Sequence, residues 1–315
     1  MELRLIDAIG PFFRGIKRRR LNWSKIPFHD LPVGSDAGDH WEDIRKGLND
    51  FATEVLAAGF NAVTLDDVAH LTDHPWYENE VRERIGYFSD RFEELIDDLL
   101  QRELRVYVTS DVVTMTKAIS RKTKGCREKQ REFYFEILER FFVRFPGVEG
   151  VILRVGESDG LDVHDDLRSE LHLRSPKEGN GFLKELLPRM EAAGKTVILR
   201  TWTVGAYRLG DLIWHRGTLG KMLEGISSEK FILSMKPGDS DFFRYLPLNK
   251  AFFRYEGKKV LELQARPEYE GAGGLPTFLG YQYSRYAEEL EGVKNLVGVS
   301  VWCQTGGWHR FRRLA

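Results

Sequence analysis

The feature that most constrains the fold of this 315-residue chain is a repeated alternation of short apolar runs with longer amphipathic stretches. This alternation predicts strands joined by helices, and right-handed crossovers of this kind make the strands parallel. We predict eight strands: Leu3–Ile9, Ala62–Asp66, Val106–Asp111, Gly150–Val155, Thr196–Trp202, Phe231–Lys236, Lys259–Ala265 and Leu296–Trp302. Eight such units indicate a (β/α)8 TIM barrel, forming one catalytic domain over residues 1–315.

Helical patterns occupy several intervals between these strands. They cover Trp41–Ala58, Arg91–Arg102, Arg127–Phe145 and Tyr281–Leu290. Turn signals such as Gly59 and Pro146-Gly147 separate the units. Only residues 303–315 follow the eighth strand, too few for another barrel helix. We therefore expect a barrel that lacks its eighth helix and is sealed by another subunit of a homo-oligomer or by a missing tail.

Composition argues against several classes of protein. The net charge of -1 lacks the basic excess of a nucleic-acid binder, and Lys17–Arg20 is the one dense basic cluster. Two cysteines permit at most one disulfide and fit a reducing compartment. The sequence contains neither a signal-peptide pattern at its start nor an apolar run of the roughly 18 residues that span a membrane. We expect a cytoplasmic protein that binds neither nucleic acid nor membrane.

Alternation along each predicted strand indicates which side chains face the barrel interior, because successive side chains point to opposite faces. In the fourth strand, Val151 and Leu153 form an apolar, helix-facing set, whereas Ile152 and Arg154 face the lumen. Other lumenal sets also end in polar or aromatic residues: Thr64 and Asp66, Thr109 and Asp111, Arg200 and Trp202, Ser234 and Lys236, Glu262 and Gln264, Ser300 and Trp302. Barrel enzymes place their active sites at these carboxyl ends, so the sequence predicts a polar mouth on an apolar barrel.

Carboxylates follow several of the predicted strands, and tryptophans accompany them. Four carboxylates lie in the loops after strands four, six and seven: Glu157, Asp159, Asp241 and Glu268. Glycoside hydrolysis needs a pair of carboxyl groups, one to protonate the leaving oxygen and one to activate water or attack the anomeric carbon. Trp202 and Trp302 suit the apolar face of a sugar ring. This combination favours a carbohydrate substrate.

Motifs for a bound nucleotide are absent from the sequence, which contains neither GxxxxGK[ST] nor a GxGxxG after the first strand. His70 and His74 are four residues apart beside several aspartates, a spacing that would suit a metal on a helix. Pro75 follows immediately, however, and the segment has the composition of a loop. We predict no metal and no cofactor.

From the fourth strand onward the chain resembles the family 67 glycoside hydrolases, α-glucuronidases that remove (4-O-methyl)glucuronic acid from xylan side chains. Four segments carry the resemblance: VILRVGESDG at 151–160, VILRTW at 197–202, FILSMKPGDSDF at 231–242 and VLELQARPEYEG at 260–271. The resemblance covers roughly half the chain. The family's amino-terminal β-domain and helical carboxyl-terminal domain have no counterpart in this sequence.

The resemblance implies roles for the matching residues. Asp241 and Glu268 fall where the family has two carboxylates proposed to activate water. Arg200 and Lys236 fall on cations that hold the uronate carboxylate, and Arg154 sits close to another such cation.

The general acid is the point at which the chain departs from the family pattern. The family reads Asp-Ser-Glu-Gly with Glu as the acid, whereas this chain reads Glu157-Ser158-Asp159-Gly160. Alignment therefore gives Asp159 and residue type gives Glu157, with a slight preference for Glu157.

We therefore predict an inverting, α-glucuronidase-like glycosidase that cleaves an anionic or related sugar from an oligosaccharide. The predicted catalytic residues are Glu157, Asp159, Asp241 and Glu268. The predicted substrate-binding residues are Arg154, Arg200, Trp202, Lys236, Asp66, Asp111, Gln264 and Trp302. Two alternatives use the same barrel: a metal-dependent sugar-acid isomerase or lyase built on Asp66 and Asp111, and a carbohydrate-binding barrel without catalysis.

Overall fold

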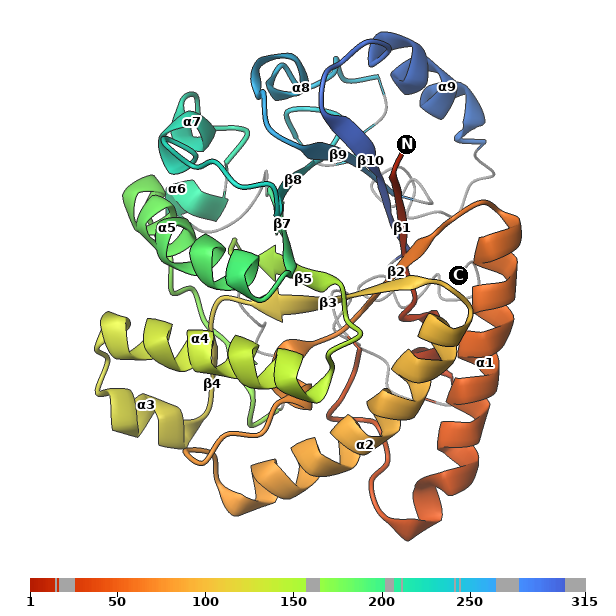
Figure 1. Cartoon of the computed structure of the whole chain (residues 1–315), viewed down its shortest axis with the longest axis vertical. Helices are drawn as coiled ribbons and strands as arrows, with labels where there is room; N and C mark the ends of the chain where they lie inside the picture. The colour runs from red at the N-terminus through yellow and green to blue at the C-terminus, as the bar shows by residue number, and fades with distance from the viewer. Residues whose placement is uncertain are drawn as a thin grey trace.

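A computed structural model of the chain confirms a closed barrel of parallel strands with helices around it (Figure 1). The structure describes residues 1–14, 16, 26–156, 165–201, 207–210, 212–240, 242–243, 245–264 and 278–303. The barrel strands are, in order around the ring, β1 (Leu3–Asp7), β2 (Ala62–Leu65), β3 (Arg105–Asp111), β5 (Gly150–Arg154), β7 (Thr196–Arg200), β8 (Phe231–Met235), β9 (Lys259–Gln264) and β10 (Leu296–Trp302). All eight predicted strands are confirmed, each end lying within two residues of its predicted position.

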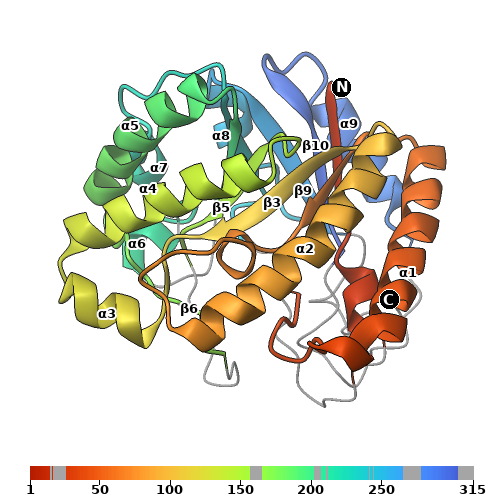
Figure 2. The same ribbon diagram turned by 60° about the horizontal axis from the view of Figure 1, so that its bottom comes forward.

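Long helices cover one half of the barrel, and shorter helices lie around the other half (Figures 1 and 2). The first half carries α1 (Gly38–Ala57), α2 (Asn79–Gln101), α3 (Lys117–Thr123), α4 (Arg127–Arg144) and α5 (Pro176–Ala192). The second carries α6 (Tyr207–Gly210), α7 (Thr218–Met222), α8 (Ala251–Arg254) and α9 (Gly280–Glu289). Among the described residues, no helix has the length and apolar character that crossing a membrane requires.

The helix predicted over Arg91–Arg102 is too short, because α2 begins twelve residues earlier, at Asn79. Val81, Ile85 and Phe88 are buried at helical spacing and extend the apolar stripe of α2 toward its amino end. The other predicted helices agree with α1, α4 and α9 to within a few residues.

Two apolar clusters confirm the predicted alternation along the strands. Leu3, Leu5, Ala62, Tyr107, Ile152, Ile198, Ile232 and Val260 form a cluster inside the barrel. The helix-facing residues, among them Val151 and Leu153, belong to a separate cluster beneath the helices. The lumenal cluster fills the part of the barrel interior nearer the amino ends of the strands, so the polar lumenal residues lie at the carboxyl ends.

The barrel closes where β10 pairs with β1, and Gly298 lies opposite Leu3 at this junction. A Cβ atom at Gly298 would stand 1.8 Å from the carbonyl oxygen of Leu3, so the close approach of the two strands requires glycine here. On the outer face of β10, Val299 is only half-buried. The predicted absence of an eighth helix concerns residues 304–315, which lie outside the described residues, and it stays a prediction.

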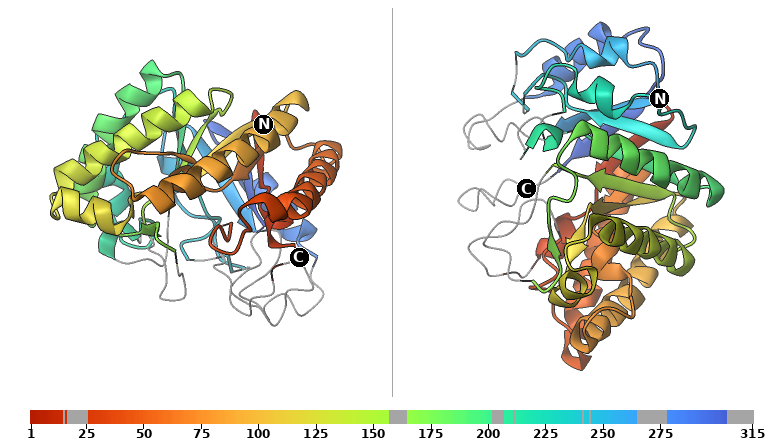
Figure 3. Two further views of the ribbon diagram at one scale, coloured as in Figure 1. Left: turned by 90° about the horizontal axis from the view of Figure 1, so that it is seen from below. Right: turned by 90° about the vertical axis from the view of Figure 1, so that its left-hand side faces the viewer.

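Loops at the carboxyl ends of neighbouring strands are joined by a small antiparallel sheet. Its strands are β4 (Thr114–Met115), which follows β3, and β6 (Arg168–Ser169), which lies in the connection after β5. Figure 3 (left) places the amino terminus at the top of the barrel, so the carboxyl ends of the strands face the bottom of that view. Pairing of β4 with β6 therefore braces one side of the mouth.

Candidate functional site

A pocket lies at the carboxyl ends of the barrel strands, and every strand contributes to it directly or through the residues that follow. Its described lining consists of Asp7, Ile9, Thr64, Asp66, Thr109, Ile152, Arg154, Ile198, Arg200, Ser234, Glu262, Ser300 and Trp302. Ile9, Ile152 and Ile198 supply its apolar lining, and Arg154 and Arg200 lie on the same strands as Ile152 and Ile198. Residues far apart in the sequence thus meet in one charged pocket.

Arg200 and Glu262 form a two-pronged ion pair across the pocket. Nε and Nη2 of Arg200 donate to the two oxygens of Glu262 at 2.8 and 2.6 Å. The side chains are only 10% and 2% exposed, and Ser234 Oγ donates a further hydrogen bond of 3.0 Å to Glu262. The guanidinium carbon of Arg200 also lies 3.4 Å from the centre of the Trp302 ring. The charge pair and the indole therefore hold each other in place.

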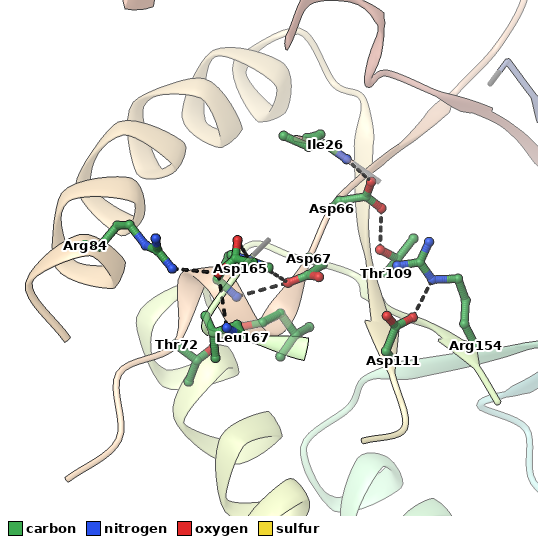
Figure 4. A network of polar contacts seen from close by, with 12 residues as sticks. Ile26, Asp66, Asp67, Thr72, Arg84, Thr109, Asp111, Arg154, Asp165 and Leu167 are labelled. Atoms are coloured by element: carbon green, nitrogen blue, oxygen red, sulfur yellow. Dashed lines mark hydrogen bonds and ion pairs between the residues drawn. The ribbon is translucent and has the colours of Figure 1, made fainter. Parts of the chain in front are cut away.

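A second ion pair stands on the adjacent wall, where β3 meets β5, the strand that pairs with β7. Nε of Arg154 donates to Asp111 at 2.7 Å. Thr109, on the same strand as Asp111, donates to Asp66, which also accepts the backbone N–H of Ile26 at 2.7 Å (Figure 4). Burial raises the pKa of Asp66, and the nearby Arg154 opposes the rise.

Asp7 is a pocket residue that the sequence interpretation missed. It ends β1, lines the pocket and accepts the backbone N–H of Cys303 at 3.2 Å. The pKa of Asp7 is raised to about 7: burial is the largest cause, Asp66 and Glu262 also raise it, and Arg200 and the Cys303 N–H lower it. The alternation of β1 carried the signal, because Asp7 has the parity of the lumenal residues Leu3 and Leu5.

The structure brings together several of the predicted substrate-binding residues. Asp66, Arg154, Arg200 and Trp302 line the pocket, and Asp111 holds Arg154. Two more predicted residues are buried at the carboxyl ends of neighbouring strands. Lys236, after β8, is 2% exposed, and Gln264, on β9, is 6% exposed.

A chain of contacts links Lys236 to the pocket. The Nζ atom of Lys236 lies 4.7 Å from the ring centre of Phe242, which in turn lies 6.3 Å from the ring of Trp302. The predicted catalytic residues Glu157, Asp159, Asp241 and Glu268, together with Trp202, lie outside the described residues.

A buried charge cluster anchors the connection after β5 beside this pocket. His70 lies in a 3-10 turn, Val68–Leu71, and its ring nitrogens face Asp67 at 2.8 Å and Asp165 at 3.1 Å. Arg84 reaches from α2 to Asp165 at 2.6 Å (Figure 4). Burial alone would lower the pKa of His70, but the two carboxylates raise it to about 10. His70 is therefore a buried imidazolium at neutral pH.

His70 and His74, which are four residues apart in the sequence, contact different partners. His74 Nε2 lies 3.0 Å from Glu136 on α4, whereas His70 lies between Asp67 and Asp165. Within the described residues, no group of three or more His, Cys, Asp or Glu side chains is arranged to hold a metal ion.

Fold and site together define a parallel eight-stranded barrel with a charged pocket at the carboxyl ends of its strands. The sequence matches no known protein-family model and no curated protein. Among solved structures, the chain is similar to a GH138 enzyme targeting pectin rhamnogalacturonan II, with a TM-score of 0.60, 11% identity and 96% of this chain covered. It spans only 34% of the length of that protein.

A second similar structure is the cellulose synthase subunit Z of Clostridioides difficile, with a TM-score of 0.51 and 13% identity. The match covers 98% of this chain and 93% of that protein. At these identities both similarities establish the barrel fold.

Proposed function

We propose that this chain is a glycoside hydrolase whose pocket takes an acidic sugar, in the manner of an α-glucuronidase. The observation that carries the proposal is the pocket itself, in which carboxyl groups, arginines and an indole meet at the carboxyl ends of a closed barrel. The indole face of Trp302 suits a sugar ring, and planar guanidinium groups suit a carboxylate. The similar structure that targets a pectin polysaccharide supports the same class of substrate.

Different environments within the pocket support acid–base chemistry. Arg154 and Arg200 are each held by a carboxylate, so their guanidinium planes are fixed before a ligand arrives. Asp7 lies in the same pocket with a pKa raised to about 7 by burial. A site with both ionised and proton-bearing carboxyl groups at neutral pH has the elements of general acid and base catalysis.

The proposed division of labour follows the resemblance. Glu157 or Asp159 would protonate the leaving oxygen, and Asp241 with Glu268 would activate the attacking water. Arg154, Arg200 and Lys236 would hold the uronate carboxylate. Inversion requires a water between acid and base, which places their carboxyl groups about 6.5–9.5 Å apart.

Hydrolysis of a glucuronate-bearing xylo-oligosaccharide tests this assignment. We expect Asp241→Ala and Glu268→Ala to lower turnover by about 10²–10⁴-fold, the usual effect of removing a general acid or base. Exposed Asp239, two residues before Asp241, provides the matched control, because Asp239→Ala should leave turnover within about twofold. Proton NMR of the first-formed product should show inverted anomeric configuration. Unchanged turnover in both Asp241→Ala and Glu268→Ala would rule out the assignment.

A further inference from the structure

We infer that Asp7 couples the binding of an acidic sugar to the uptake of one proton, so that the pocket takes its ligand with Asp7 in the neutral, hydrogen-bond-donating form. The inference rests on the proposed function, since it assumes an anionic sugar in this pocket. It adds a specificity-determining residue that the family resemblance did not indicate, at a strand end that the sequence interpretation overlooked.

The arginines of the pocket are each paired with a carboxylate. Glu262 neutralises Arg200, and Asp111 neutralises Arg154. Within the described part of the chain, Asp7 forms no ion pair and accepts a single hydrogen bond, from the backbone N–H of Cys303. Asp7 is therefore a carboxyl in excess of the two ion pairs.

Asp7 differs in its exposure to the pocket from Asp66, the other lining carboxyl that belongs to neither ion pair. Asp66 is 2% exposed and accepts hydrogen bonds from Thr109 and from the backbone of Ile26. Asp7 keeps partial exposure at the end of β1, in the wall of the pocket. A ligand in the pocket would thus meet Asp7 directly.

The groups that face Asp7 come from four other parts of the barrel. Arg200 on β7 favours its ionised form, whereas Glu262 on β9 and Asp66 after β2 disfavour that form. Cys303 after β10 contributes a backbone N–H, and burial raises the pKa of its thiol, so the thiol stays uncharged. With the pKa of Asp7 at about 7, a modest added field suffices to protonate it.

The negative charge of an acidic sugar supplies that added electric field. A carboxylate held near Arg200 would place a second negative charge beside Asp7 in a pocket with buried walls, and like charges at short range cannot both stay ionised cheaply. Protonated Asp7 instead donates an O–H to a sugar oxygen or to the ligand carboxylate, a short and strong hydrogen bond. The proton comes from solvent and returns to solvent when the ligand leaves, so no bond in the sugar is altered by this step.

Isothermal titration calorimetry with D-glucuronate, in two buffers of different ionisation enthalpy, tests the inference on the wild-type chain. The apparent affinity equals the intrinsic affinity multiplied by the fraction of protonated Asp7. We therefore expect the Kd to rise about tenfold between pH 6 and pH 8, with uptake of about half a proton per ligand at pH 7.

Variants assign the proton to its residue. Asp7→Asn keeps the shape and the donor but cannot titrate, so its Kd should be constant from pH 6 to pH 8, with no proton uptake. Asp73→Asn, which changes an exposed carboxyl that does not line the pocket, should retain the tenfold difference. A neutral sugar, methyl α-D-glucoside, should bind the wild type without proton uptake.

The outcomes separate this inference from the proposed function. Glucuronate binding that is independent of pH in the wild type, or still pH-dependent in Asp7→Asn, overturns the role of Asp7 and leaves the hydrolase standing. Absence of glucuronate binding at every pH overturns the inference and removes the uronate from the proposed substrate. Since the wild-type titration needs no variant, a folding defect in Asp7→Asn does not weaken the test.

Discussion

Glu262→Gln is expected to lower the free energy of unfolding by about 3–5 kcal/mol, because it removes one partner of a buried ion pair and leaves the other without its counter-charge. Glu262 accepts two hydrogen bonds from Arg200 and one from Ser234, and its side chain is 2% exposed. The amide that replaces it keeps the shape but loses the charge. Urea denaturation followed by circular dichroism measures the difference.

An exposed ion pair of similar geometry provides the control. Arg82 donates to both oxygens of Asp73 at 2.8 Å, but the two side chains are 41% and 44% exposed. Asp73→Asn should therefore cost less than about 1 kcal/mol. A loss in Glu262→Gln no larger than that in Asp73→Asn would show that the pair in the pocket contributes no more than a surface pair.

His70→Gln is expected to be comparably destabilising, by about 3–5 kcal/mol near neutral pH, because it removes the cation between Asp67 and Asp165. Asp165 comes directly after the segment that contains Glu157 and Asp159, so the variant should also impair any turnover that depends on the position of that segment. Differential denaturation of variant and wild type measures the first effect, and the hydrolysis assay measures the second.

The stability difference between wild type and His70→Gln is expected to depend on pH in a definite direction. The pKa of His70 rises from 6.5 to about 10 on folding, so its contribution to stability is complete below pH 6.5 and is lost as the pH rises toward 10. The advantage of wild type over His70→Gln should shrink across that window. His74 is the control, because burial lowers its pKa and His74→Gln should show no such loss at high pH. A constant difference between pH 6 and pH 9.5 would contradict a buried imidazolium at His70.

Much of the fold could be predicted from the sequence because strand periodicity is a local property. Val151 and Leu153 pack beneath the helices, whereas Ile152 lies in the lumenal cluster and Arg154 lines the pocket, as the alternation along the strand predicts. The start of α2 was harder to predict. Val81, Ile85 and Phe88 repeat at helical spacing, but polar residues separate them, and their burial is evident only in the structure.

The alternation of side chains along the strands predicted which residues share the pocket, but it did not predict which of them form pairs. Parity placed Asp66, Arg154 and Arg200 together, but it could not show that Glu262 and Asp111 would hold the two arginines, because pairing depends on distances across the lumen. Asp7 was overlooked for a related reason. A lone aspartate after an apolar strand is common, and the pKa of this one is raised by burial and by Asp66 and Glu262, which come from distant strands.

A crystal structure of the chain soaked with glucuronic acid tests most directly whether this pocket binds an acidic sugar for hydrolysis. We expect the sugar at the carboxyl ends of the strands, with its ring against Trp302 and its carboxylate within hydrogen-bond distance of Arg154, Arg200 or Lys236. We also expect two carboxyl groups on opposite sides of the anomeric carbon, about 6.5–9.5 Å apart. An empty pocket at saturating sugar, or a sugar bound elsewhere on the barrel, would contradict the proposed function.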